Sequence, residues 1–357
     1  MAFLVLFQPV VYQWLEACQP AAGTFGAAVY GQITHVPWQG FCFWDIIMPL
    51  FMFMSGITIP FSMAKYQRGE SKAGAGFLLR LLKRFVVLWL LGMVVQGNLL
   101  ALDARLLHLY SNTLQSIAVG YVAVAFLFVF CSLRTQIVAV SLSFMAYIAI
   151  FALWGHFDFT IDANICEAID RAVLGRFRDG VQWQGDTWHW DPTYHYTWIM
   201  SSLNFIVTVY LGTLAGYLLK STRTAMQKFR WLMWGGAAMI AVSLLMHPWI
   251  PIIKHIWSSS MTLFAGGICF VLMGLFYYII DVKGCRRGWM WLRYYGMNSL
   301  AAYFIGDYMN FKSITNSLFF GFHQWMGDYY AVLQVTMHGI WVLILKLMFR
   351  LNLYIKA

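Results

Sequence analysis

The sequence predicts an all-α, polytopic integral membrane protein of about ten transmembrane helices with both termini in the cytoplasm. Composition is the first reason. Hydrophobic residues make up 61% of the 357 positions and charged residues only 11%, whereas a soluble domain carries about 25% charged residues. The apolar residues also fall into runs of about 20, the length at which an α-helix crosses the hydrocarbon core of a bilayer. A soluble globule with so few charges is therefore excluded.

The distribution of basic residues is the second reason. The segment from Lys65 to Arg84 carries six Lys and Arg side chains, so we place it in the cytoplasm. When the apolar runs alternate across the membrane from there, 18 of the 24 basic residues fall inside and 6 outside, as the positive-inside rule expects. The net charge of +10 then reflects orientation in the membrane, not nucleic-acid binding. The runs are 2–17, 41–63, 85–102, 113–131, 136–155, 198–219, 231–249, 258–280, 294–309 and 330–349.

The connections between the runs complete the predicted architecture. The first run is weakly apolar, starts at the first residue and has no signal-peptide cleavage site, which predicts that a native N-terminal flank is missing. Residues 132–135 are predicted to form a tight turn. The outer loop 156–197 is rich in Asp, Trp and His, and its segment 161–177 predicts a short amphipathic helix on the membrane surface. We expect one transmembrane domain over 1–357, with 156–197 as an insertion.

Polar groups within apolar runs are costly in hydrocarbon, so each is a candidate functional residue. Asp45 opens the second helix, and His35 precedes it in the loop. A carboxylate orients an imidazole and raises its basicity, so the two side chains would form a His–Asp dyad if they meet. The structural alternative is an interfacial His and an Asp that caps a helix. Asn298, within the ninth run, must likewise hydrogen-bond either a neighbouring helix or a substrate.

Several familiar chemistries have no support in the sequence. It contains no Walker motif, no Rossmann glycine pattern and no G-x-S-x-G elbow. His189 and His195 in the outer loop show no metal-ligand spacing, and the six cysteines form no C-x-x-C pair, so we interpret the cysteines as small apolar residues and expect no metal. Lys254 and His255, in a short outer loop, either bind an anionic group or mark an interface.

A resemblance to a known family rests on motifs in the same order along nearly the whole chain. His35, Trp38-Gln39-Gly40, Asp45 and the P-x-F-x-F-x-x-G segment from Pro49 to Gly56 resemble a stretch of the heparan-alpha-glucosaminide N-acetyltransferases and their bacterial relatives. The further matching motifs are Leu211-Gly212 with Ala215-Gly216, Lys254 with Trp257-Ser258, Asp281 to Gly284, Gly296 to Ser299 with Tyr303, and Trp341 to Lys356.

The resemblance implies a transmembrane acetyltransferase of the bacterial inner membrane. Such an enzyme moves an acetyl group from cytoplasmic acetyl-CoA to the amine of a glucosamine-like sugar or glycan on the far side. The resemblance also implies that His35 is the general base or acyl carrier, and that Asp45 and Asn298 are further catalytic residues. Glycine-rich faces around Gly266 and Gly274 leave a homodimer open. The implied donor-binding residues are Gln115, Lys254, Trp257, Ser258, Ser299 and Tyr303.

The sequence departs from the family pattern at three places. The family's motif S-x-D-x-x-R-G-F-D-M before the first helix is absent. The Gln-Arg pair of the fourth helix reads Gln115-Ser116, which removes a candidate anion contact, and the polar start of the sixth helix reads Tyr196 to Ile199. Two alternatives therefore stay open: a membrane transporter for N-acetylglucosamine or another amino sugar, and an inactive membrane relative. Paired broken helices and acidic residues at mid-membrane would favour the transporter.

Overall fold

The computed structural model describes residues 11, 12, 15, 18, 21, 23–67, 74–308, 313, 317–327 and 340–354. The chain forms two compact units. Unit 1 comprises Met1–His35, Cys42–Trp44 and Cys285–Ala357, and unit 2 comprises Val36–Phe41 and Asp45–Gly284. The fold class is confirmed as mostly helical, while the prediction of a single domain over 1–357 stays a prediction.

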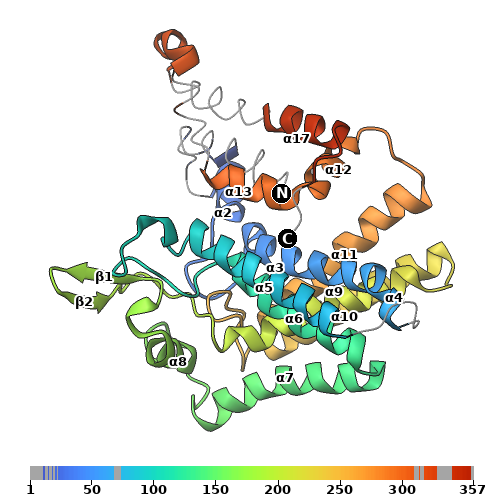
Figure 1. Ribbon diagram of the computed structural model, residues 1–357, viewed down its shortest axis with the longest axis horizontal. Coiled ribbons are helices and arrows are strands. Elements are labelled where there is room, and N and C mark those ends of the chain that lie inside the picture. The colour runs from blue at the N-terminus through green and yellow to red at the C-terminus, as the bar shows by residue number, and fades with distance from the viewer. Residues whose placement is uncertain are drawn as a thin grey trace. The chain divides into compact units, whose positions relative to one another are not determined.

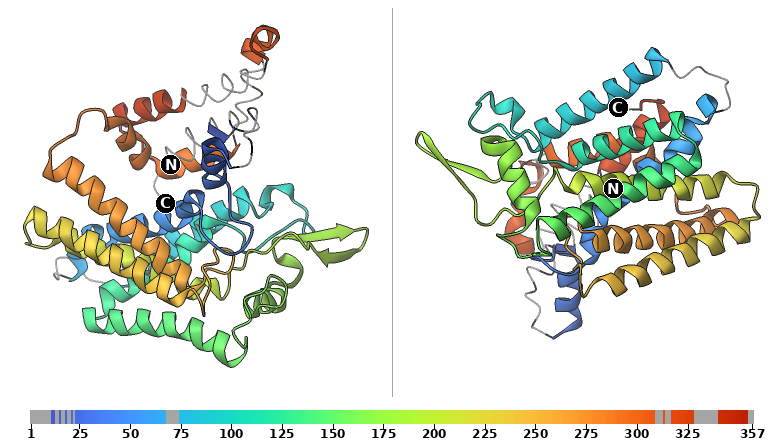
Figure 2. Two further views of the ribbon diagram at one scale, coloured as in Figure 1. Left: turned by 180° about the vertical axis from the view of Figure 1, so that it is seen from behind. Right: turned by 90° about the horizontal axis from the view of Figure 1, so that it is seen from below.

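Unit 2 is a bundle of long helices joined by short loops at one end and by a folded outer segment at the other (Figure 1). Helix α3 packs along α9, α10 along α11, and α6 against both α5 and α9. Figure 2 shows α10 and α11 side by side. The long helices are α3 (Ile47–Ser62), α5 (Ala75–Val95), α6 (Thr113–Phe130), α7 (Leu133–Leu153), α9 (Ser201–Lys220), α10 (Ala225–Met246) and α11 (Ser259–Tyr277).

Shorter elements of unit 2 lie between these helices. The 3₁₀ turn η2 (Phe43–Ile46), of which Asp45 and Ile46 belong to unit 2, leads into α3, and α4 (Ala64–Gln67) follows α3. The segment between α7 and α9 holds α8 (Ile165–Leu174), η4 (Gly175–Phe177) and a hairpin of β1 (Val181–Gln184) and β2 (Thr187–Trp190), which are antiparallel with Val181 opposite Trp190. The remaining short elements are η3 (Leu99–Ala101) and the π-helical turn η5 (Tyr278–Val282).

Side chains cap the starts of the long helices, where backbone N–H groups have no intrahelical acceptor. Asn112 caps α6 in a capping box with Gln115, and Thr224 caps α10 in the same way with Gln227. Ser132 caps α7, and the connection is shorter than the predicted turn at 132–135, because α7 already begins at Leu133. Asn164 caps α8 inside the segment predicted as a short amphipathic helix, and Ser258 caps α11.

Close approach of α3 and α9 fixes the centre of unit 2. A Cβ on Gly56 would lie 1.9 Å from the Val209 carbonyl oxygen, and one on Gly212 would lie 1.9 Å from the Phe53 carbonyl oxygen. Only glycine fits at either position, as in other membrane helix pairs with small residues in contact. Thr213 donates from its hydroxyl to the Gly56 carbonyl at 3.2 Å and ties the two helices further.

Six helical segments among the described residues are long and apolar enough to cross a membrane. They match six of the predicted runs, whereas the count of about ten is not confirmed. The predicted run 2–17 lies largely outside the described residues, as does the first part of 330–349. The six segments are Phe43–Tyr66, Thr113–Phe130, Leu133–Leu153, Ser201–Lys220, Ala225–Met246 and Ser259–Val282.

Two predicted segments differ in the structure. Helix α5 begins at Ala75, ten residues before the predicted run, so Arg80, Lys83 and Arg84 lie on a helix and not in a loop. Lys and Arg are good helix formers whose long stems lie along apolar surface, so their charge did not end the helix. The ninth run is not one helix, because α12 ends at Met297 and α13 begins at Ser299.

Unit 1 holds the short helices at the two ends of the chain. Besides α12 (Met290–Met297) and α13 (Ser299–Tyr308), its described elements are α2 (Phe25–Gln32), η6 (Phe320–Phe322), α15 (His323–Met326) and α17 (Ile340–Arg350). Helix α12 packs against α17, and Tyr295 of α12, Leu345 of α17 and Ala302 of α13 form a small apolar core.

Candidate functional site

Three loops of unit 2 meet at one end of its bundle, which we call the outer end after its predicted orientation. The Gly40 N–H donates to the Ile252 carbonyl at 2.8 Å, and Gln39 forms an isolated bridge with Ile253. The Trp38 indole N–H donates to the Phe159 carbonyl at 2.9 Å. Thr197 donates to the His255 carbonyl at 3.0 Å. The segments 36–41, 154–200 and 247–258 are therefore held together.

A buried ion pair joins two residues that the sequence singled out separately. Lys254 Nζ lies 3.2 Å from Asp45 Oδ1, and the two side chains are 10% and 1% exposed. Desolvation lowers the pKa of Lys254, while the charge of Asp45 and their hydrogen bond act to raise it. Asp45 stands on η2 at the start of α3, so the pair fixes the 247–258 loop to that helix start.

A cluster of four rings lies beside this ion pair; we call Trp38, His195, Tyr196 and His255 the outer ring cluster. Trp38 stacks on His255 with 5.5 Å between ring centroids, and His195 meets Trp38 edge-on at 6.0 Å. Tyr196 lies 4.3 Å from His255, and Lys254 Nζ lies 5.6 Å from the Tyr196 centroid. All four residues are half-buried. Burial, and then the charge of Asp45, raise the pKa of Tyr196 to about 12.

Trp257 and Ser258, both implied as donor-binding residues, are buried within the fold of their loop. The Trp257 indole N–H donates to the Thr208 hydroxyl at 3.1 Å, and Asn204 donates to the Trp257 carbonyl at 2.8 Å. The Ser258 hydroxyl accepts from the N–H of Met261 as the cap of α11 and donates to the Pro251 carbonyl at 2.8 Å. These contacts make the loop rigid, and they define a structural role for both residues.

Gln115 is likewise engaged in the local fold. Its side-chain oxygen accepts from the N–H groups of Ser111 and Asn112, at 2.9 and 3.0 Å, and its amide donates to the Leu109 carbonyl at 2.7 Å. The side chain thus completes the capping box of α6. Ser116, which stands where the family pattern has Arg, is fully buried beside it.

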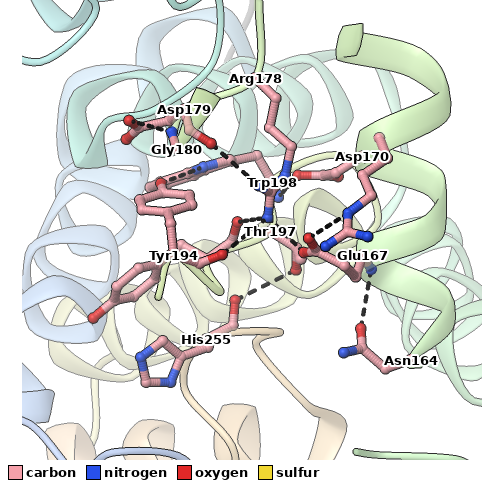
Figure 3. Close-up of polar contacts among 12 residues, drawn as sticks. Asn164, Glu167, Asp170, Arg178, Asp179, Gly180, Tyr194, Thr197, Trp198 and His255 are labelled. Carbon is pink, nitrogen blue, oxygen red and sulfur yellow. Dashed lines mark hydrogen bonds and ion pairs between the residues drawn. The ribbon is translucent and has the colours of Figure 1, made fainter. Parts of the chain in front are cut away.

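An extensive charge network, which sequence patterns hardly indicate, organises the outer segment between α7 and α9 (Figure 3). Arg178 is fully buried, and its guanidinium donates to Glu167 Oε2 at 2.5 Å and to the carbonyls of Tyr194 and Tyr196. Arg171 reaches the other oxygen of Glu167 at 2.8 Å. Four residues apart on α8, Glu167 and Arg171 were recognisable as a helical pair, whereas Arg178 looked like any outer basic residue.

Asp170 connects this network to α9. Its two carboxylate oxygens accept from the backbone N–H groups of Trp198 and Ile199, at 2.7 and 3.0 Å. Burial raises the pKa of Asp170 to about 7, against the opposing effects of those hydrogen bonds and of the nearby Arg178. The start of α9 is therefore tied to α8 through one buried carboxyl.

Asp179 is the centre of a second group that sequence reasoning missed. Its Oδ1 lies 3.3 Å from His108 Nδ1 and accepts from the Gly180 N–H at 2.9 Å, and its Oδ2 accepts from Gln96 at 3.0 Å. His108 precedes α6 and Gln96 follows α5, so these contacts tie the 96–112 loop to the outer segment.

The remaining predicted site residues belong to unit 1. His35 is exposed, and its ring lies 6.2 Å from that of Trp44, while Gln32 accepts from the Phe43 N–H at 2.9 Å. Asn298 is buried at the break between α12 and α13, where its carbonyl accepts from the Ala302 N–H. Ser299 opens α13 and Tyr303 is half-buried on it. The dyad of His35 with Asp45 joins residues of different units and stays a prediction.

No group of three His, Cys, Asp or Glu side chains among the described residues has the geometry to hold a metal ion. The two cysteines buried deepest, Cys166 and Cys269, are free thiols within the described structure.

Comparisons with known proteins identify two relatives. No family model matches the sequence. The chain is 24% identical to heparan-alpha-glucosaminide N-acetyltransferase of Mus musculus over an alignment of 393 positions, which covers 93% of this chain and 57% of the relative. It is also 24% identical to the enzyme of that name from Homo sapiens over 335 residues, or 78% of this chain and 49% of the relative. The chain thus spans about half the length of the curated relatives it matches.

The similarity agrees with the family resemblance of the motifs, because it runs through most of the chain. The six long apolar segments agree with it as well. The chain is a multi-pass helical membrane protein and a distant homologue of the heparan-alpha-glucosaminide N-acetyltransferases.

Proposed function

We propose that this protein is a transmembrane acetyltransferase, which moves an acetyl group from acetyl-CoA at the inner face of the membrane to the amine of an amino sugar at the outer face. The observation that carries the proposal is the similarity to N-acetyltransferases along 93% of the chain. The bacterial inner membrane is the location we propose with it.

The inner end of unit 2 supports a site for the anionic donor. Lys220 Nζ donates to the Pro60 carbonyl at 2.8 Å and Lys228 Nζ to the Leu219 carbonyl at 2.7 Å. The guanidinium of Arg84 stacks over Tyr121 at 3.8 Å, and that of Arg80 donates to the Tyr66 hydroxyl. None of these four cations forms an ion pair with a described acidic side chain. Their uncompensated charge fits the phosphates of a coenzyme A thioester.

The proposed base, His35, comes from the outer side of the predicted topology. A neutral amine gains a positive charge on nitrogen when it forms the C–N bond to the acyl carbon. Because the amide product is neutral, one N–H proton must be taken by a base. We propose that His35 takes this proton as a general base. The C–S bond then breaks, and coenzyme A leaves as the thiolate. An acyl-His35 intermediate remains the alternative route.

Asn298 is proposed to donate a hydrogen bond to the thioester oxygen as negative charge develops there. A well-aimed donor of this kind contributes about 2.7–4 kcal/mol to the barrier reduction. The break between α12 and α13 supports this role, because an interrupted helix exposes backbone and side-chain polar groups that a continuous helix would satisfy internally.

The first prediction tests the transferase directly. His35→Ala should lower acetyl transfer at least about 100-fold, because that is the low end of what a general base contributes. The measurement is transfer of labelled acetyl from acetyl-CoA to a glucosamine-terminated oligosaccharide by protein in proteoliposomes. His189→Ala, a half-buried histidine on the outer hairpin, is the matched control and should retain full activity.

The same preparation separates the proposal from its rivals. Uptake of unmodified amino sugar without acetyl-CoA would indicate a carrier, and the broken helix at Asn298 is a feature that carriers share. A wild-type protein that neither acetylates nor transports would indicate an inactive relative. Near-normal transfer by His35→Ala would remove His35 from the mechanism while leaving the transferase in place.

A further inference from the structure

The outer ring cluster has three features that a simple apolar core or a membrane-facing aromatic belt does not explain. Its rings come from three loops far apart in the sequence, they are half-buried, and two of the four are histidines. An imidazole facing lipid would be costly, since its polar nitrogens find no partner there. A fully packed core would bury all four rings. A half-buried cluster of aromatic and imidazole rings is typical of a ligand site.

The outer ring cluster is also held in place by the protein itself, before any ligand binds. The indole N–H of Trp38 is fixed on the Phe159 carbonyl, and the backbone of His255 is fixed by the Thr197 N–H. Beneath the rings, the Asp45–Lys254 ion pair pins the loop that carries His255. Binding sites whose rings are already locked lose little conformational entropy when a ligand binds.

The chemistry of the outer ring cluster indicates the class of ligand. Ring faces carry negative quadrupole charge and attract C–H groups and ammonium groups. The cluster already holds one ammonium in this way, because Lys254 Nζ lies against the Tyr196 face. A pyranose presents C–H bonds on its faces and hydroxyls at its edge, so it complements indole faces flanked by imidazole nitrogens. An amino sugar adds the cationic group that such faces favour.

We propose that Trp38, His195 and His255 form the stacking subsite for the pyranose ring of the amino-sugar acceptor. This assignment rests on the proposed acetyl transfer, since it names where the acceptor of that reaction binds. Asp45 and Lys254 are positioning residues in this subsite: they are more deeply buried than the half-exposed rings, and they hold the loop of His255.

The second prediction tests this subsite. Trp38→Ala should weaken binding of a glucosamine-terminated trisaccharide about 10-fold, the loss expected for about 1.4 kcal/mol of stacking. Trp38→Phe should restore most of the affinity, because a phenyl ring keeps an aromatic face. Equilibrium dialysis with radiolabelled trisaccharide, on protein in nanodiscs without acetyl-CoA, gives the dissociation constants. The control is Trp188→Ala on the outer hairpin, where an exposed tryptophan lies away from the cluster.

Kinetics supply a second readout. Trp38→Ala should raise the KM for the trisaccharide about 10-fold while leaving the KM for acetyl-CoA within about 2-fold. His255→Gln should behave like Trp38→Ala toward the trisaccharide, and size-exclusion profiles identify any variant that fails to fold.

The outcomes distinguish the two proposals. Trisaccharide binding by Trp38→Ala equal to that of wild type overturns the subsite and leaves acetyl transfer standing. Absence of trisaccharide binding by folded wild-type protein also overturns the subsite. Tight, Trp38-dependent binding without any consumption of acetyl-CoA would support the subsite and refute the transferase.

Discussion

At the scale of single residues, the contact of Asp45 with Lys254 decides how the outer end of unit 2 is held. Removing one partner of a buried pair leaves the other charge without compensation, which costs far more than the pair itself contributes. Desolvation already lowers the pKa of Lys254, which shows that its charge is expensive at this depth.

The third prediction follows from this contact. Asp45→Asn should lower the free energy of unfolding by about 3–5 kcal/mol, because the Lys254 ammonium stays buried without its carboxylate. Adding Lys254→Met should recover much of the loss. Thermal unfolding in detergent, followed by intrinsic fluorescence, measures both variants. Arg105→Ala breaks the exposed pair with Asp186 and should leave the unfolding midpoint nearly unchanged; an equal loss there would contradict the argument from burial.

The sequence could name these residues but not their partners. Asp45 and Lys254 were both singled out as polar groups beside apolar runs, yet they are more than two hundred positions apart and no local spacing links them. Arg178 escaped notice for the same reason: its burial comes from α8 and from the backbone carbonyls of Tyr194 and Tyr196. Glu167 and Arg171, one helical turn apart, form the kind of pair that a sequence does reveal.

At the scale of helices and strands, apolar run length predicted the long helices well, while their ends were set by caps. Asn112, Ser132 and Ser258 begin three helices at or near the predicted positions, whereas Thr224 begins α10 six residues before its predicted run. Hydropathy failed at α5, where basic side chains continue the helix beyond its apolar part. It failed again at Asn298, because an apolar average over 294–309 does not detect a single residue with φ −125° and ψ 39°.

The fourth prediction concerns the α3–α9 contact. Gly212→Ala should destabilise the protein by about 1–3 kcal/mol or more, because its methyl group would overlap the Phe53 carbonyl and force the two helices apart. Thermal unfolding of the variant in detergent measures the loss. The matched control is Gly76→Ala on α5, where no atom lies within 4 Å of the added methyl, and there we expect equal or slightly greater stability. Equal midpoints for the two variants would show that α3 and α9 do not meet as described.

At the scale of the whole molecule, the distribution of charge predicts which end of unit 2 faces the cytoplasm. The loops at the inner end carry Lys and Arg without described acidic partners, whereas the outer segment pairs Arg105, Arg171 and Arg178 with carboxylates. Orientation in a membrane follows the unpaired basic excess in short loops. Composition alone thus predicted a helical membrane protein, but the division into two compact units depends on long-range contacts that no sequence pattern expresses.

The fifth prediction tests that orientation. In a variant without native cysteines, Asp186→Cys should react with a membrane-impermeant maleimide added to intact cells, because its side chain is 91% exposed on the outer hairpin. Thr222→Cys, in the exposed turn between α9 and α10, should react only after the membrane is permeabilised. Labelling of Thr222→Cys in intact cells, with protection of Asp186→Cys, would reverse the topology.

The glycine contact of α3 with α9 has a mechanical consequence. Two helices that touch backbone to backbone leave no room for lipid or water to enter between them, and they cannot slide by a residue without collision. Any movement of helices within unit 2 during turnover must therefore be a movement of the other helices relative to the α3–α9 pair, which stays rigid.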